Sequence, residues 1–161
     1  MTWNWSEDIK KYVVDLTNSV DTILLGRKMT DGFISYWSNV KPESEEYPFA
    51  KKMVNYDKVV FTKTLDKSNW ENTTLAKGDI TDEVNKIKKQ NSKKDIVVYG
   101  GAGFVSSLIK NNLIDEYNLF INPTAIGKGL EIFKDVDSKL SLNLIKSTAF
   151  DCGIVVNQYQ P

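Results

Sequence analysis

The sequence predicts an α/β fold with a mostly parallel central sheet, flanking helices and a C-terminal antiparallel hairpin. Up to about residue 115, short apolar runs rich in β-branched residues alternate with segments whose apolar residues recur at helical spacing. This alternation is typical of a parallel sheet with helices on both faces. The remaining chain instead contains two alternating runs, Leu140 to Phe150 and Gly153 to Tyr159, which indicate a hairpin.

Each element has its own local signal. Ser6 is a suitable N-cap for a first helix, Pro48 suits the first turn of another, and Asn112 is a sensible end for the last. The predicted helices span residues 6–18, 27–37, 48–55, 81–90 and 104–111. The predicted strands span residues 20–26, 58–64, 72–77, 96–99, 116–121, 140–150 and 153–159.

Length and composition predict one domain over residues 1–161, with 41% hydrophobic and 26% charged residues. The 21 basic residues equal the 21 acidic residues, which argues against a protein that binds nucleic acid by bulk charge. No apolar run approaches the roughly 18 residues of a membrane helix, and the N-terminus lacks the pattern of a secretory signal. We therefore expect a cytoplasmic protein with no membrane partner.

The sequence has no histidine and a single cysteine, Cys152. An intrachain disulfide is therefore excluded, and the composition fits a reducing compartment. Ser-His-Asp and Cys-His catalytic groups and the usual zinc sites are excluded as well, so we predict no metal. Unless a carboxylate or a lysine carries the chemistry, a cofactor must supply it.

Residues 95–104 read Asp-Ile-Val-Val-Tyr-Gly-Gly-Ala-Gly-Phe. A buried strand over Ile96–Tyr99 is broken by Gly100, Gly101 and Gly103, and a helix begins at about Ala102. The free N–H groups and positive dipole end of that helix favour an anion such as a pyrophosphate. Alternatively, the glycines only form a tight turn, because their spacing does not match G-x-G-x-x-G.

Two further turns repeat this theme. Gly26-Arg27-Lys28 places two cations at a helix N-terminus, where they oppose the dipole unless an anion is bound. Thr62-Lys63-Thr64 ends a strand with hydroxyls and a cation that suit a phosphate. The alternatives are that Arg27 and Lys28 are solvated surface residues and that the threonines are simply good β-strand residues.

The three turns come in an order and approximate spacing that resemble the dihydrofolate reductase fold. The matching segments are Ile-Leu-Leu-Gly-Arg-Lys-Met at 23–29, Val-Val-Phe-Thr-Lys-Thr at 59–64 and Val-Val-Tyr-Gly-Gly-Ala-Gly-Phe at 97–104. Leu-Phe-Ile-Asn-Pro at 119–123, Gly-Lys-Gly at 127–129 and Phe133 look more like the C-terminal reductase domain of the bifunctional riboflavin-biosynthesis deaminase-reductase, RibD, and its stand-alone bacterial relatives. The resemblance covers nearly the whole chain.

This resemblance implies an NADPH-dependent oxidoreductase that reduces a small heterocycle, dihydrofolate-like or aminopyrimidine-like, by hydride transfer. In the family the first two turns lie near the adenosine 2′-phosphate and the glycine turn receives the pyrophosphate. The implied cofactor-binding residues are Gly26, Arg27, Lys28, Thr62, Lys63, Thr64, Gly100, Gly101, Ala102, Gly103 and Phe104. Tyr36 and Trp37 either line the substrate side or belong to the core. No catalytic acid is assigned, and a homodimer is expected at the family level.

The sequence departs from the family in one respect. Family members begin with a further strand and a Ser-x-Asp-Gly-type turn, and that strand lies beside the one predicted over Ile96–Tyr99. Its absence has three explanations: a truncated chain, closure of the gap by the two flanking strands, or a strand supplied by a partner chain. The alternative to an enzyme is therefore a non-catalytic nucleotide-binding or oligomerisation module that lost its pocket with that strand.

Overall fold

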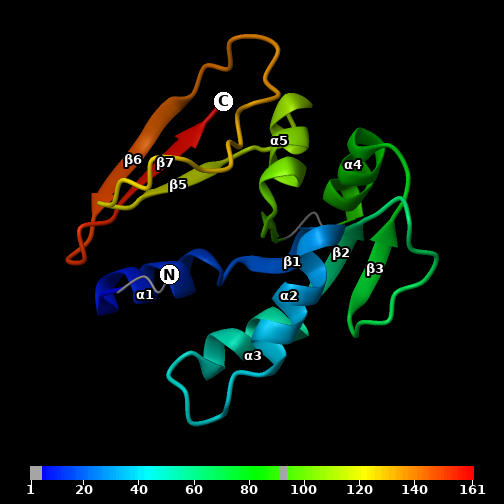
Figure 1. The fold of residues 1–161 in the computed structure, drawn as a ribbon, viewed down its shortest axis with the longest axis horizontal. Helices are drawn as coiled ribbons and strands as arrows, with labels where there is room; N and C mark the ends of the chain where they lie inside the picture. The colour runs from blue at the N-terminus through cyan, green and yellow to red at the C-terminus, as the bar shows by residue number, and fades with distance from the viewer. Residues whose placement is uncertain (1–4, 91–93) are drawn as a thin grey trace. The chain divides into compact units, whose positions relative to one another are not determined.

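The fold was obtained as a computed structural model that describes residues 5–90 and 94–161. The described residues form two compact units, one over Thr17–Val105 and one that combines the segment ending at Leu16 with Ser106–Pro161 (Figure 1). The single domain expected over residues 1–161 stays a prediction. Among residues 5–90 and 94–161, none of the helices has the length and apolar character that a membrane crossing requires.

The unit over Thr17–Val105 is built on a parallel sheet with the strand order β3-β2-β1-β4. Its strands are β1 (Val20–Gly26), β2 (Asp57–Phe61), β3 (Thr73–Ala76) and β4 (Asp95–Val98). Five consecutive residues of β1, Thr22–Gly26, pair with β2, and β4 pairs with the other edge of β1. The central β1 is buried over almost its whole length, as expected for a strand that is covered on both faces.

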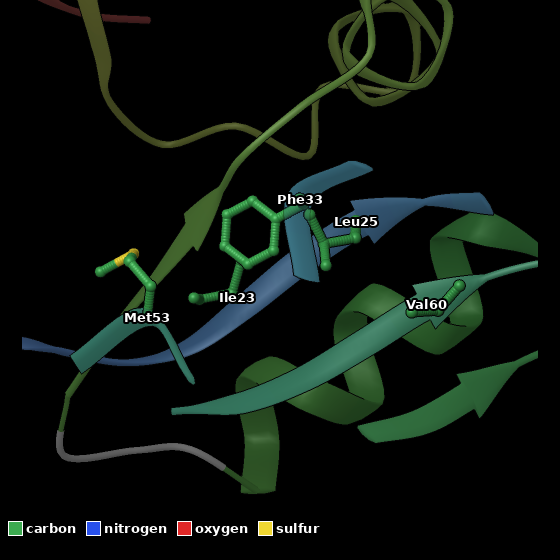
Figure 2. Packing of buried hydrophobic residues seen from close by; sticks show 5 residues of the cluster. All are labelled: Ile23, Leu25, Phe33, Met53 and Val60. Atoms are coloured by element: carbon green, nitrogen blue, oxygen red, sulfur yellow. The ribbon is translucent and has the colours of Figure 1, made fainter. Parts of the chain in front are cut away.

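Between β1 and β2 lie α2 (Arg27–Ser38) and α3 (Tyr47–Asn55), and between β3 and β4 lies α4 (Ile80–Gln90). After β4 the chain forms α5 (Ala102–Lys110), whose first residues belong to this unit. Figure 2 shows the core cluster that β1, β2, α2 and α3 share. It contains Ile23, Leu25, Phe33, Met53 and Val60, all 5% exposed or less.

The other unit contains α1 (Glu7–Leu16) and an antiparallel sheet with the order β5-β7-β6. Its strands are β5 (Tyr117–Ile121), β6 (Asn143–Ala149) and β7 (Val155–Gln160). The predicted hairpin is confirmed, because β6 and β7 pair antiparallel and the turn between them places Gly153 at φ 83°. Its core cluster contains Ile9, Phe150, Ile154 and Val156.

The predicted fold class is confirmed, with two differences of detail. β5 lies not in the parallel sheet but in the antiparallel one, because β7 pairs with β5 on one edge and with β6 on the other. The second strand ends at Phe61 rather than Thr64. The reason is that the Thr62 hydroxyl oxygen accepts the N–H groups of Thr64 and Leu65, which turns the backbone away from the sheet.

One edge of β4 bears on the expected missing strand. The N–H groups of Asp95 and Tyr99 donate to carbonyls of Ser19 and Leu24, on the β1 side. Alternation therefore places the backbone groups of Ile96 and Val98 on the opposite edge. No other strand of the unit over Thr17–Val105 pairs with that edge. All three explanations for the missing strand stay open.

Replacement of Gly100 by alanine should destabilise the Thr17–Val105 unit. Gly100 has φ 123°, and a Cβ there would collide with the Met29 side chain. We expect Gly100→Ala to lower the free energy of unfolding by at least about 2 kcal/mol, from backbone strain and overpacking together. Urea denaturation measures this change. In the control variant Gly32→Ala the new Cβ meets no heavy atom within 4 Å, and stability should rise by up to about 1 kcal/mol. A stable Gly100→Ala protein would contradict this view of the turn.

Candidate functional site

The three turns predicted from the sequence follow β1, β2 and β4, and all lie at the carboxyl edge of the parallel sheet. Gly26 is opposite Phe61 and Leu24 is opposite Val98 in the strand register. Neighbouring strands lie about 4.8 Å apart, so the chain segments that leave them start close together. In the sheet, β2 and β3 lie on one side of β1, and the next strand of the sequence, β4, lies on the other side. Ligands of open α/β sheets bind at such a reversal, outside the carboxyl ends of the strands.

Contacts around Gly26 join the turns to one another. A Cβ on Gly26 would lie 2.9 Å from the Cβ of Phe104 and 3.7 Å from the Gly100 carbonyl oxygen. The Phe104 ring also packs on Phe61, with 4.8 Å between ring centroids. The glycine turn therefore packs directly on the ends of β1 and β2. Gly26 and Phe104 have packing roles that are independent of any ligand.

The glycines of the third turn divide into two kinds. Gly100 is required by its positive φ and by the Met29 side chain that packs against it. Gly101 has φ 80°, but at Gly101 and at Gly103 a Cβ would meet no heavy atom of the described residues within 4 Å. The space in the Cβ direction of these two glycines is therefore not filled by the described residues. This space is the observation that best fits a bound diphosphate.

The helix N-termini at this edge lack the usual negative charge. α1 and α4 carry acidic residues in their first turns, as the helix dipole favours, whereas α2 and α5 carry none. The N-cap of α2 is Gly26, which offers no side chain to the first N–H groups. Two adjacent strands thus lead into helices whose positive ends are not compensated by first-turn carboxylates. An anion at this edge would supply the missing charge.

Three cations surround the same edge. The Nη1 of Arg27 lies 2.8 Å from Asp31 Oδ2, and its guanidinium carbon lies 5.3 Å from the centre of the Trp70 ring. Lys28 and Lys63 are exposed, and neither forms a salt bridge with an acidic residue in the part of the chain that the structure describes. Arg27 is therefore held in place, while the two lysines can move toward a ligand.

The Thr62-Lys63-Thr64 turn has one buried and two exposed residues. Thr62 is 6% exposed, and its Oγ1 accepts N–H groups from Thr64 and Leu65 at 3.2 Å each. Its own N–H donates to Ala76, 3.0 Å away. The Thr62 hydroxyl therefore shapes the turn, and Lys63 and Thr64 are the residues that it presents to solvent.

The RibD C-terminal domain family model matches residues 1–156. The chain belongs to the RibD C-terminal domain family. The predicted resemblance is confirmed.

Among individual relatives of this RibD C-terminal chain, the uncharacterized protein YyaP of Bacillus subtilis is 34% identical over 141 residues, which are 88% of this chain and 74% of YyaP. A candidate riboflavin biosynthesis protein of Shewanella sp. PV-4 has a similar structure, with a TM-score of 0.72 and 21% identity over 98% of this chain and 80% of that one. A second similar structure is that of the Thermotoga maritima diaminohydroxyphosphoribosylaminopyrimidine deaminase/5-amino-6-(5-phosphoribosylamino)uracil reductase. Its TM-score is 0.67 and its sequence identity is 16%, over 98% of this chain and 50% of the Thermotoga chain. Both structures support the fold.

Tyr36 and Trp37 do not reach the carboxyl edge in this RibD C-terminal chain. They lie nine and ten residues after Arg27 on α2, about 14 Å along the helix axis. Trp37 packs on the core cluster and on Phe49, with 5.2 Å between ring centroids. Tyr36 is 56% exposed and its hydroxyl donates to Glu46 at 3.2 Å. Partial burial and the nearby Glu46 raise the pKa of Tyr36. Their role in substrate binding stays a prediction.

Tyr99 is the ionisable residue at the end of β4. Its ring packs on Phe33, with 4.8 Å between ring centroids. Burial, with smaller contributions from Tyr36 and Glu46, raises the pKa of the Tyr99 phenol above its usual value of 10.0. The phenol is therefore protonated at neutral pH.

Sequence reasoning missed Trp70 and Met29 as neighbours of the predicted turns. Trp70 lies in the loop between β2 and β3, and Met29 in the first turn of α2. A signal for Trp70 was present, because it is the one aromatic residue in the polar stretch 66–72. Its contact with Arg27 depends on strand pairing and could not be read from spacing.

The two threonines of the second turn provide a matched test. Thr62→Val should lower the free energy of unfolding by about 1–3 kcal/mol, because two N–H groups lose their acceptor at a buried position. Thr64→Val, the same change at an exposed position, should stay within about 0.5 kcal/mol. Equal effects in urea denaturation would show that the Thr62 hydroxyl does not hold the turn.

Proposed function

We propose that this RibD C-terminal chain is an NADPH-dependent reductase of a small heterocycle. The observation that carries the proposal is the open space over Gly101 and Gly103 at the N-terminus of α5. It lies at the carboxyl edge of the sheet, where two cation-bearing turns also lie. A diphosphate requires close approach to backbone N–H groups, and an additional phosphate requires cations. This edge has both features.

The residues fit the cofactor in a specific arrangement. The backbone over Gly101–Phe104 would receive the diphosphate at the dipole end of α5. Arg27, Lys28 and Lys63 would bind the adenosine 2′-phosphate, which NADH lacks. Gly26, Gly100 and Thr62 would act indirectly, because they shape the turns that present those groups.

When bound, NADPH would supply the hydride, and the chain would bind, orient and exclude water from the reactants. The Thermotoga relative is named as a reductase of an aminouracil derivative, which supports a pyrimidine-like substrate here. A dihydrofolate-like substrate is the alternative within the same reaction class. The proton source is left unassigned.

A second candidate is a non-catalytic nucleotide-binding or oligomerisation module. The observation that favours it is the β4 edge, which no strand of the same unit covers, because a substrate side built on that edge would then be incomplete. The two candidates differ in turnover. An enzyme oxidises NADPH when an aminopyrimidine substrate is added, whereas a binding module is stabilised by NADPH without oxidising it.

Cofactor binding should be more sensitive to substitution of Gly103 than folding is. Gly103→Ala places a methyl group in open space within a helix, so the unliganded protein should keep or gain stability, by up to about 1 kcal/mol. The same methyl would occupy the diphosphate position, and we expect NADPH affinity to fall at least about tenfold, or 1.4 kcal/mol. Thermal shift and titration with NADPH measure both effects.

The matched control is Gly32→Ala, which adds a methyl in open space to the exposed face of α2. It should gain similar stability and bind NADPH as the parent protein does. If NADPH binds with a micromolar dissociation constant, a concentration one hundred times that constant stabilises the folded protein by about 2.7 kcal/mol. A wild-type protein that shows no such stabilisation would refute the proposal. Equal NADPH binding by both variants would place the diphosphate elsewhere.

We further propose that the chain forms a homodimer through its antiparallel unit. β6 is an edge strand that is exposed along nearly its whole length, and Leu144 and Ile145 are 56% and 54% exposed. Ile126 and Leu130, from the segment before β6, are 61% and 87% exposed. Exposed apolar groups on an edge strand favour association with another chain.

Light scattering after gel filtration should give the mass of a dimer. Ile145→Lys should shift the protein toward monomer, because a charge on an edge strand opposes pairing. Thr74→Lys, an exposed position on the edge strand β3 of the other unit, should leave the mass unchanged. A monomer before any substitution would exclude this proposal.

A further inference from the structure

We propose that Trp70 is a positioning residue that holds the Arg27 guanidinium for the 2′-phosphate and so makes the site select NADPH over NADH. This inference rests on the proposed function. Its basis is the geometry of one side chain on α2 and one in the loop between β2 and β3. The sequence alone gave Trp70 no role.

Arg27 is constrained from two sides. Its Nη1 donates to Asp31 at 2.8 Å, one helical turn along α2. Its guanidinium carbon lies over the Trp70 ring, 5.3 Å from the centroid, which is within the range of a cation–π contact. The Arg27 side chain is still 33% exposed. A guanidinium carries five N–H donors, so the Asp31 contact leaves others for a phosphate.

Trp70 is itself fixed by its surroundings. Its side chain is partly buried and packs against the core cluster. Its backbone is tied by Ser68, whose hydroxyl donates to the Trp70 carbonyl and accepts the Trp70 N–H, at 3.2 Å each. Ser68 therefore holds the Trp70 backbone while the core cluster supports its indole, which is the ring that Arg27 contacts.

The same loop begins with the Thr62-Lys63-Thr64 turn. One segment thus carries Lys63 and the aromatic ring that the Arg27 guanidinium contacts. A long, flexible arginine loses side-chain freedom when it binds a phosphate, and a side chain that is already held loses less. This smaller entropy loss favours only a ligand that carries the phosphate, so it raises the affinity for NADPH relative to NADH.

The test is a titration of the full chain with NADPH and, separately, with NADH, by calorimetry. Trp70→Leu removes the π face and retains an apolar side chain. It should weaken NADPH binding about five- to tenfold and change NADH binding less than about twofold. Trp70→Phe retains a π face and should keep most of the NADPH affinity. Trp5→Leu, the same substitution in the other compact unit, should change neither affinity.

A double-mutant cycle separates positioning from general damage. Arg27→Gln should lower NADPH affinity selectively, and Trp70→Leu in that background should cause no further loss, because its effect passes through Arg27. Urea midpoints of each variant establish that it is folded. If Trp70→Leu does not fold, the cycle uses Trp70→Phe, for which a smaller loss that disappears in the Arg27→Gln background is expected.

The outcomes distinguish this inference from the function on which it rests. A wild-type chain that binds neither nucleotide refutes the proposed function and this inference with it. A chain that binds NADPH, but in which Trp70→Leu weakens both nucleotides equally or neither, retains the function and overturns the inference. Independent effects of Trp70 and Arg27 in the cycle also overturn it. A selective loss that the Phe variant restores supports it.

Discussion

The constraint on which the candidate site depends is the parallel pairing of β1 with β2 and β4. Register places Gly26 opposite Phe61 and Leu24 opposite Val98, so three strands end at one edge of the sheet. Each is followed by a turn that carries glycine, threonine or a cation. None of these turns would suffice alone, because a helix N-terminus or a lysine is common on any protein surface. Their convergence at one edge is what supports the proposed anion site.

The glycines show how folding and ligand binding share one motif. Gly26 and Gly100 are glycines because Phe104 and Met29 leave no room for a Cβ, so their cause is internal packing. Gly101 and Gly103 have no such neighbour among the described residues. Gly101 has φ 80°, which favours glycine with or without a ligand, so Gly103 is the position of the four that neither packing nor backbone conformation explains. A motif that looks uniform in the sequence therefore has two physical origins, and substitutions at its four positions should separate stability from binding.

The charged side chains at the same edge carry a net positive charge, and one of them, Arg27, is held in a defined position. The first turns of α2 and α5 lack carboxylates, and Arg27 and Lys28 add positive charge at the start of α2. Asp31 partly offsets Arg27 and, with Trp70, restricts where its guanidinium lies. Lys63 approaches from the neighbouring strand end and is exposed. The arrangement retains favourable electrostatics for an anion, and only one of the three cations loses its freedom before binding.

The sequence by itself determined the elements, the parallel class of the first sheet, the hairpin, the family and the three turns, because these follow from local periodicity, glycine conformation and helix ends. Tertiary structure decided what depends on pairing: β5 pairs with β7, the Thr62 hydroxyl accepts two backbone N–H groups, and Trp37 packs against the core cluster. It also brought Trp70 to Arg27 across 43 positions of sequence. Side chains that far apart meet only through the register of the strands that carry them, and no local pattern encodes that register.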